Sequence, residues 1–279
     1  MTGIEGSHYM ELNQHQLEQL KQTELELLRH FITVCEQLGL TYYVLGGTML
    51  GAVRHQGFIP WDDDIDVGML RKDYEILLQK GQALLPEGIF LQTFGTDPQY
   101  PANFAKLRNS HTTFVESSVR DRAINHGVYI DIFPLDYYPD QGRRWFSVKK
   151  ELLSLRISTT FTVSGMKPTT KLVRLFTRLL YPTVRGALRK REKLFKSVRS
   201  GTHIANHCGA WGAKEIVPAQ WYGSGTPMAF EDMTVTVPVD YHSWLTQVYG
   251  DYMQLPPEEK RIPHHFVADF DLTQARWER

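Results

Sequence analysis

Apolar residues recur at three- and four-residue steps over 12–38, and this period predicts a helix that ends at Gly39. A run of aromatic and β-branched residues over 41–45 then predicts a buried strand that ends at a pair of glycines. Residues 48–55 predict a short helix with Thr48 as its N-cap. The front of the chain therefore predicts a helix, a strand and a second helix in close succession.

The rest of the first half mixes strands with one more helix. A strand is expected over 62–69 and a helix over 71–85. Further strands are expected over 89–94, 103–108, 112–116 and 127–133. This order predicts a small mixed β-sheet flanked by helices.

The second half of the chain is dominated by helical periods. Helices are expected over 143–160, 171–199 and 241–253, and one strand over 235–239. The pattern therefore predicts an α+β fold with a mostly helical C-terminal part. We expect a boundary near residue 140, with one region over 11–140 and a second over 141–279 whose tail folds back over the first.

Composition narrows the class of protein. The chain has 279 residues with 31 basic and 31 acidic side chains, so it has no formal net charge, which argues against a general nucleic-acid coat protein. Cys35 and Cys208 stand alone and form neither a disulfide framework nor a zinc motif, which favours a reducing cytoplasm. No apolar run reaches the roughly 18–20 residues of a membrane span, and we expect no secretion signal.

The stretch Asp62-Asp63-Asp64-Ile65-Asp66-Val67 is the most informative in the chain. Side chains alternate along a strand, so Asp62, Asp64 and Asp66 are expected on one face. Carboxylates that share a face repel one another, and a divalent cation offsets this repulsion; oxygen ligands alone favour Mg²⁺ or Mn²⁺ over Zn²⁺. The alternative is an exposed acidic turn, but the neighbouring Ile65 and Val67 favour a half-buried strand.

A glycine turn precedes this acidic stretch. Gly46 and Gly47 join the first predicted strand to the short helix, and they allow the backbone to approach a phosphate closely. The helix N-terminus offers free N–H groups, and the hydroxyl of Thr48 adds a donor. A turn of this kind beside an acidic strand indicates a phosphate chain on the loop and a metal ion on the strand.

A third acidic element lies in the apolar run over 128–133. Asp131 interrupts this run, and a charge in such a place is rarely buried unless it is paired or bound to a metal. We interpret Asp131 as a third ligand beside Asp64 and Asp66; it is also a candidate acceptor for the proton of an attacking hydroxyl. Asp136 follows a proline and is interpreted as a cap or turn residue.

Three strings carry a family resemblance. LGGTMLGAVRHQGFIPWDDDIDVGM (45–69) closely resembles the LicD family, which has a nucleotidyltransferase fold, includes bacterial phosphocholine transferases and is related to fukutin-type enzymes. YIDIFPLD (129–136) and YGDYMQLPPEEKRIPHH (249–265) are similar to the same family. The resemblance implies that Asp64, Asp66 and Asp131 are metal ligands and that Gly46, Gly47 and Thr48 form the phosphate turn. Sixteen residues separate Gly47 from Asp64, a longer gap than is usual in the superfamily but the LicD pattern.

Basic and imidazole side chains near these motifs are candidates for binding the donor. Each has a plainer alternative, because Arg54 also suits the C-terminal end of a helix dipole and isolated lysines are mostly surface charges. The resemblance suggests that the histidine pair folds over the site. The candidates are Arg54, Lys72, Lys106, Arg108, His264 and His265.

Residues 171–199 hold ten Lys or Arg and one Glu, a net charge of +9, interleaved with leucine and phenylalanine. This pattern is typical of a basic amphipathic helix at an anionic membrane surface. The alternative is a helix packed on the domain with a solvated face. Nucleic-acid binding fits less well, because no recognition motif accompanies the charge.

The resemblance implies a Mg²⁺-dependent phosphotransferase. Such an enzyme moves phosphocholine, ribitol phosphate or glycerol phosphate from a CDP-linked donor to a sugar hydroxyl of a cell-surface glycan precursor, and releases CMP. An alternative with the same fold is a nucleotidyltransferase that moves NMP from NTP and releases pyrophosphate. A third is a carbohydrate- or membrane-binding relative without turnover. We expect a lipid-linked acceptor and a cytoplasmic protein that contacts the inner face of the membrane peripherally.

Overall fold

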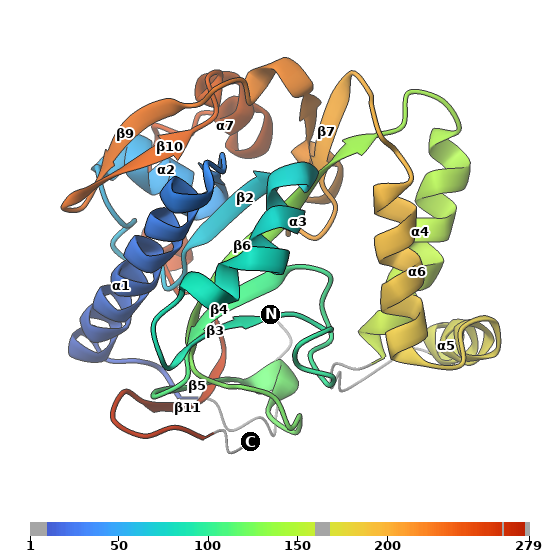
Figure 1. Cartoon of the computed structure of the whole chain (residues 1–279), viewed down its shortest axis with the longest axis horizontal. Helices are drawn as coiled ribbons and strands as arrows, with labels where there is room; N and C mark the ends of the chain where they lie inside the picture. The colour runs from blue at the N-terminus through green and yellow to red at the C-terminus, as the bar shows by residue number, and fades with distance from the viewer. Residues whose placement is uncertain (1–9, 160–167, 264, 277–279) are drawn as a thin grey trace.

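The computed structural model describes residues 10–159, 168–263 and 265–276. A mixed seven-stranded sheet forms its centre (Figure 1), with β2 and β6 as a parallel pair and antiparallel neighbours on both sides. The order along the main path is β1-β2-β6-β4-β3, and β7 and β8 extend the sheet from the far end of β6. These strands are β1 (Tyr43–Val44), β2 (Asp66–Leu70), β3 (Ile89–Gln92), β4 (Ala105–Asn109), β6 (Val128–Tyr138), β7 (His203–Asn206) and β8 (Ile216–Pro218).

Helices α1 (Gln14–Leu38) and α3 (Arg71–Lys80) contact the sheet at β6, as Figure 1 shows. Asn13 and Gln16 form a capping box at the start of α1, and Gly39 ends the helix with a φ of +63°, as the sequence predicts. On β6, Ile130 and Ile132 are fully buried, as alternate positions on one face of a central strand should be. The opposite face of β6 is therefore available to Asp131 and its neighbours.

Two antiparallel pairs lie outside the main sheet. One is the hairpin of β9 (Thr226–Phe230) and β10 (Met233–Val237), and the other joins β5 (Thr113–Glu116) to β11 (Val267–Asp271). Helix α2 (Gly46–His55) contacts β9, and α7 (Tyr241–Tyr249) follows the hairpin (Figure 1). The C-terminal strand β11 therefore pairs with β5, a strand from the first half of the chain.

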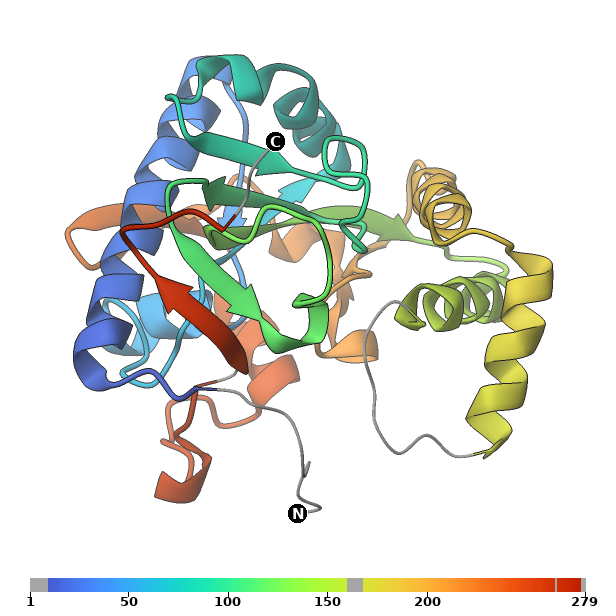
Figure 2. The ribbon, with the colours of Figure 1, turned by 90° about the horizontal axis from the view of Figure 1, so that it is seen from below.

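Three further helices stand beside the sheet. Helices α4 (Arg143–Ser158) and α6 (Val184–Lys196) pack against each other around a small apolar core, and α5 (Pro168–Leu180) crosses their ends at the edge of the molecule (Figure 2). The described helices include none that is long and apolar enough to span a membrane. The basic segment over 171–199, predicted as one helix, is divided between the two short helices α5 and α6.

The predicted α+β class is confirmed, but several local expectations are corrected. Helix α2 begins at Gly46 and its N-cap is Leu45, so Thr48 is the third residue of the helix and not its N-cap. Strand β2 begins at Asp66, and residues 62–65 are irregular. The second half of the chain contributes β7 to β11, where the sequence predicts one strand, because short strands of three to five residues have too few positions for a clear period. The division near residue 140 stays a prediction.

Candidate active site

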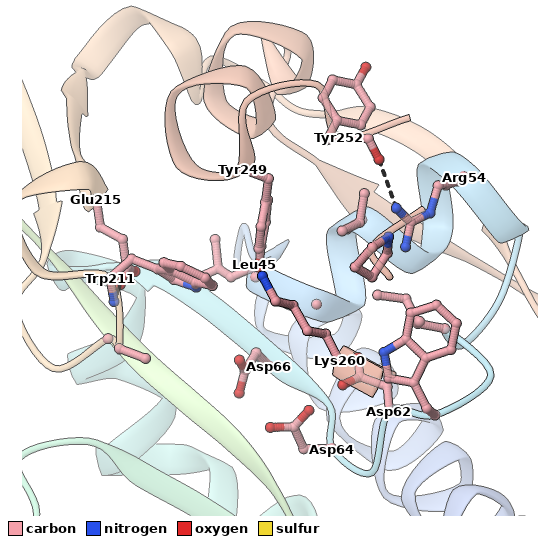
Figure 3. A pocket seen from close by; sticks show the side chains of 18 of the residues that line it. Leu45, Arg54, Asp62, Asp64, Asp66, Trp211, Glu215, Tyr249, Tyr252 and Lys260 are labelled. Atoms are coloured by element: carbon pink, nitrogen blue, oxygen red, sulfur yellow. Dashed lines mark hydrogen bonds between the residues drawn. The ribbon is translucent and has the colours of Figure 1, made fainter. Parts of the chain in front are cut away.

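Asp66 and Asp131 lie side by side on the two parallel central strands. They are register partners in the β2–β6 pair, and the amide of Asp131 donates to the carbonyl of Ile65 over 2.9 Å. Partners in a sheet register project to the same face. Both carboxylates therefore enter one cavity of about 1050 Å³, together with Asp62 and Asp64 (Figure 3).

The three consecutive carboxylates Asp62, Asp63 and Asp64 form a tight group in the irregular loop before β2. Each offers an oxygen, and these oxygens lie within 4.8 Å of one another. The expectation that Asp62, Asp64 and Asp66 share a strand face is wrong, because the loop is not a strand and its carboxylates converge instead of alternating. Within the part of the chain that the structure describes, Asp62, Asp63 and Asp64 lie close enough together to share one metal ion, whereas Asp64, Asp66 and Asp131 lie farther apart.

Burial and mutual repulsion disfavour the charged forms of these carboxyl groups. Burial, followed by the charge of Asp62, raises the pKa of Asp64 to about 7. Burial and the charges of Asp64 and Asp131 raise the pKa of Asp66 well above its ordinary value, and burial raises that of Asp131 although Lys106 opposes the shift. A site with several hard oxygen donors and too little positive charge fits a divalent cation such as Mg²⁺ or Mn²⁺.

The glycine turn lies directly against this acidic group. Gly46 has a φ of +52°, and a Cβ there would lie 3.1 Å from Oδ2 of Asp66; a Cβ on Gly47 would lie 2.5 Å from Oδ2 of Asp62. The first amide bonded within α2 is that of Met49, to the carbonyl of Leu45, so the amides of residues 46–48 precede the helical ladder. Gly46 and Gly47 line the cavity, as the sequence predicts.

Thr48 has a different position from the predicted one. Its side chain is buried, and Oγ1 accepts a hydrogen bond of 2.8 Å from the amide of Asp66. Thr48 is absent from the residues that line the cavity. The hydroxyl therefore fixes the start of β2 against α2, and in this way positions Asp66, rather than facing a phosphate.

Arg54 lines the cavity on the side opposite the sheet (Figure 3). Its Nη1 donates to the carbonyl of Tyr252 over 2.8 Å, and its Nε donates to Nε2 of His55 over 2.9 Å. Burial lowers the pKa of Arg54 from its ordinary value. The guanidinium is thus held in place at the cavity wall.

Lys106 and Arg108 share one face of β4, as predicted, but their surroundings differ. Lys106 is the register partner of Asp131, and its Nζ lies 3.1 Å from Oδ1 of Asp131. Arg108 is fully buried and donates to Oε1 of Gln92 and to the carbonyl of Gly127, each over 2.6 Å. Neither Lys106 nor Arg108 is among the residues that line the cavity, so the predicted contact of these side chains with a phosphate is not supported by their positions.

The remaining predicted side chains are Lys72, His264 and His265. Lys72 is exposed at the start of α3, which follows the C-terminal end of β2. It does not line the cavity. His264 lies outside the described residues. The amide of His265 donates to Oδ2 of Asp63 over 3.1 Å, and its Nδ1 lies 3.2 Å from Oδ1. Burial opposes protonation, but the hydrogen bond to Asp63 and the charge of Asp64 raise the pKa of His265 to about 10.

Several cavity residues escape the sequence interpretation. They come from segments 206–215 and 249–261, whose polar, irregular sequences show no period. The rings of Trp211 and Tyr249 meet edge to face with centroids 5.0 Å apart, and the buried Glu215 accepts from the amide of Trp211 (Figure 3). The family-like string over 249–265 was the one available signal for Tyr249 and for Lys260, which also lines the cavity.

Carboxylates on adjacent strands of a mixed sheet, beside a glycine turn at a helix N-terminus, are the features expected of a nucleotidyltransferase-type domain. The family model described as "LicD/FKTN/FKRP, nucleotidyltransferase domain" matches residues 39–184, just over half of the chain. The chain therefore belongs to the LicD family.

Individual relatives agree with this assignment. The chain is 29% identical over 267 residues to the lipopolysaccharide cholinephosphotransferase LicD of Haemophilus influenzae, which covers 89% of this chain and 95% of that protein. It is 44% identical over 117 residues to the ribitol 5-phosphate transferase FKRP of Homo sapiens, which covers 42% of this chain but 21% of that protein. An uncharacterized Rickettsia prowazekii protein, RP689, is 34% identical over 102 residues, or 36% of this chain and 34% of that protein. The similarity to the first relative extends over nearly the whole of both chains.

Proposed function

We propose that this LicD-family protein is a Mg²⁺-dependent phosphotransferase. It moves phosphocholine or a polyol phosphate, such as ribitol or glycerol phosphate, from a CDP-linked donor to a sugar hydroxyl of a cell-surface glycan precursor, and releases CMP. The observation that carries the proposal is the register pairing of Asp66 with Asp131 beside Gly46 in one large cavity. The transferase names of the two characterised relatives support the same reaction class.

Asp64, Asp66 and Asp131 are the proposed metal ligands, and Asp62 is a further carboxylate in the same cavity. The raised pKa values of Asp64, Asp66 and Asp131 support this proposal, because a bound cation would remove the repulsion that causes part of the shift. When bound, Mg²⁺ or Mn²⁺ would neutralise charge on the donor phosphates.

The chain itself supplies positioning and proton transfer in this proposal. The amides at the start of α2 bind phosphate oxygens, and the guanidinium of Arg54 neutralises negative charge from the opposite wall. Lys106 holds the carboxylate of Asp131 in one orientation. Positioning and charge neutralisation of this kind supply most of the catalysis of phosphoryl transfer.

The proposed step is an in-line displacement. The oxygen of the acceptor hydroxyl attacks the phosphorus that bears the head group, and its proton passes to the carboxylate of Asp131. The bond between this phosphorus and the oxygen bridging to CMP breaks, and CMP leaves with the electron pair. Asp131 is the proposed acceptor of the proton because it enters the cavity beside its register partner Asp66.

The proposal also covers the acceptor, the cellular location and the roles of the two regions of the chain. The acceptor is a lipid-linked glycan, and the enzyme acts in the cytoplasm at the inner face of the membrane, with the catalytic core in residues 11–140 and the acceptor side in 141–279. No nucleic acid takes part.

Product analysis tests this function directly. The protein is incubated with Mg²⁺ and CDP-choline, CDP-ribitol or CDP-glycerol, with an acceptor glycan, and CMP is measured. We expect Asp66→Asn and Asp131→Asn to lower CMP release by about a thousandfold or more. Asp232→Asn changes an exposed carboxylate on the far side of the β9–β10 turn and is the matched control.

Three results would contradict the proposal. Release of pyrophosphate from a nucleoside triphosphate, without CMP from any CDP donor, would assign the chain to the nucleotidyltransferase alternative. Full turnover in Asp66→Asn or Asp131→Asn would remove these carboxylates from the reaction. A melting temperature that does not respond to Mg²⁺, with or without cytidine nucleotide, would favour the non-enzymatic alternative.

A further inference from the structure

Helix α5 exposes an apolar face that no described part of the chain covers. Leu172 and Leu179 have exposed fractions of 72% and 75%, values that are rare for leucine in a folded domain. The face repeats at positions i, i+3, i+4 and i+7, the period of one side of a helix. Its large apolar side chains are Leu172, Leu175, Phe176, Leu179 and Leu180.

The neighbouring helix α6 behaves differently, although it belongs to the same basic segment. Its apolar side chains, Ala187, Leu188, Leu194 and Phe195, are buried against Phe146, Leu153 and Ile157 of α4. Helix α6 therefore fits the alternative of a helix packed on the domain with a solvated face. The exposed apolar surface of residues 171–199 is confined to α5.

Hydrogen bonds connect the turn that follows the C-terminal end of α5 to helix α4. Arg156 of α4 is buried and donates from Nε to the carbonyl of Tyr181 over 2.7 Å and from Nη2 to that of Pro182 over 2.9 Å. These bonds fix the turn between α5 and α6. Figure 2 shows α5 running along the outer edge of the molecule, beyond α4 and α6 and away from the sheet. This placement presents the helix to a large flat surface.

Exposed basic side chains occur on α5 and, for the most part, on the helix α6 that follows it in the chain. They are exposed and have no carboxylate partner within the part of the chain that the structure describes. The group comprises Arg178, Arg185, Arg189, Lys190 and Lys193. An apolar helical face combined with exposed positive charge is the pattern of a helix that lies in the interface of an anionic bilayer.

We propose that α5 docks on the surface of an anionic lipid bilayer, with Leu172, Leu175, Phe176 and Leu179 inserted between the lipids. A second copy of this chain is a poorer occupant, because it would bring two segments of net charge +9 face to face. This inference extends the proposed location of the enzyme at a membrane, but vesicle binding does not depend on the proposed reaction.

Vesicle sedimentation tests the proposal with the full chain. We expect binding to vesicles of phosphatidylglycerol and phosphatidylcholine, much weaker binding to phosphatidylcholine alone, and release by salt. The double variant Leu175→Ser/Phe176→Ser should lower the partition coefficient by about tenfold or more, because two apolar side chains no longer enter the bilayer. The variant Arg185→Glu should weaken binding only to the anionic vesicles.

The chain offers a matched control on α4. Trp145 and Val148 are exposed to a similar degree as Leu175 and Phe176, but lie at the other end of the α4–α6 pair (Figure 1). Trp145→Ser/Val148→Ser should bind vesicles as the unaltered chain does. Melting temperatures of both double variants should stay unchanged, because all four side chains are exposed.

Three outcomes would overturn the proposal. One is equal sedimentation with anionic vesicles of the unaltered chain and the α5 variant; another is no binding of the unaltered chain to any vesicle. The third is a dimer in sedimentation velocity that Leu175→Ser/Phe176→Ser converts to a monomer, which would assign the face to a second copy. CMP release on a soluble acceptor reports on the proposed reaction separately, and α5 substitutions should leave it unaltered.

Discussion

Lys106 and Asp131 stand opposite each other on the antiparallel strands β4 and β6, with Nζ of Lys106 3.1 Å from Oδ1 of Asp131. The same ammonium lies 3.2 Å from Oε2 of Glu116 and 3.2 Å from the centroid of the Tyr129 ring. One buried cation is thus shared by two carboxylates and an aromatic face. The negative charge of Asp131 in the cavity is therefore balanced in part by this lysine.

Lys106→Met should therefore impair both turnover and stability. We expect CMP release to fall by about a hundredfold and the free energy of unfolding to fall by about 3 kcal/mol, because two buried carboxylates lose their cation. Turnover is measured well below the melting temperature so that unfolding does not contribute. Lys72→Met, on the exposed surface of α3, should leave both quantities unchanged; a large loss there would restore Lys72 to the site.

Gly46 and Gly39 form a natural pair for testing the phosphate turn. Both have a positive φ, +52° and +63°, but a Cβ at Gly46 meets Asp66 at 3.1 Å whereas a Cβ at Gly39 meets nothing within 4 Å. Each alanine substitution should cost about 1 kcal/mol of stability for the left-handed backbone. Only Gly46→Ala should lower CMP release. Equal activity of the two variants would separate the turn from the reaction.

Asp64 should destabilise the metal-free protein at neutral pH. Its pKa is raised to about 7 in the folded protein, so the unfolded chain loses the proton first and stability falls as the pH rises from about 4 to 7. In EDTA, Asp64→Asn should increase the free energy of unfolding by about 2 kcal/mol or more above pH 7, and change it little at pH 3. Denaturant unfolding across this range provides the measurement.

A control and a contrary result are available for Asp64. Asp121→Asn removes an exposed carboxylate and should leave the pH dependence unaltered. If Asp64→Asn gives no gain in stability at any pH, the repulsion inferred in the acidic group is absent.

His265 should stabilise the folded protein, whereas Asp64 destabilises it. Its pKa is raised to about 10, so its contribution to stability is fully present below pH 6.5 and is lost as the pH rises towards 10. His265→Gln should lower the free energy of unfolding by about 3 kcal/mol at pH 6, and the difference should disappear by about pH 10. Thermal unfolding of both proteins in EDTA follows this convergence. A constant difference across the range would show that His265 stabilises the fold without its charge.

Arg71 tests the value of a buried ion pair beneath the site. Its Nε and Nη2 donate to the two oxygens of Asp136 over 2.7 and 2.6 Å, and Asp136 is buried. Arg71→Met should cost about 3–5 kcal/mol because it leaves this carboxylate without a partner. Arg29→Met breaks the pair with Asp232, which is exposed on both sides, and should cost about 1 kcal/mol or less. Similar losses in the two variants would contradict this distinction.

The predicted residues that the structure places at the cavity are those marked by a local sequence pattern. The glycines at 46 and 47 and the aspartate inside the apolar run at 131 conflict with ordinary strand and helix composition, and such conflicts indicate a constraint other than folding. The start of β2 at Asp66 was harder to predict, because alternation over six residues does not distinguish a strand from a loop with converging carboxylates. The metal role of Asp64, Asp66 and Asp131 stays a prediction.

The misplaced residues depend on partners far away in the sequence. Asp136 was interpreted as a cap or turn residue, but it lies inside β6 and pairs with Arg71, 65 positions earlier. Thr48 suits an N-cap by its type, yet its hydroxyl binds the amide of Asp66 on a neighbouring strand. Trp211 lies between β7 and β8 and Tyr249 is the last residue of α7, so both reach the cavity through long-range packing. Local propensity contains no information on such long-range contacts.

The bond between Asp63 and His265 has a consequence for synthesis. These residues are 202 positions apart, so the acidic loop leaves the ribosome long before its imidazole partner is made. Until that partner arrives, the nascent chain carries a concentrated group of negative charges with this contact unmade. The Asp63–His265 bond can therefore form only after residue 265 has been made, when the segment that continues into β11 lies against the front half of the chain.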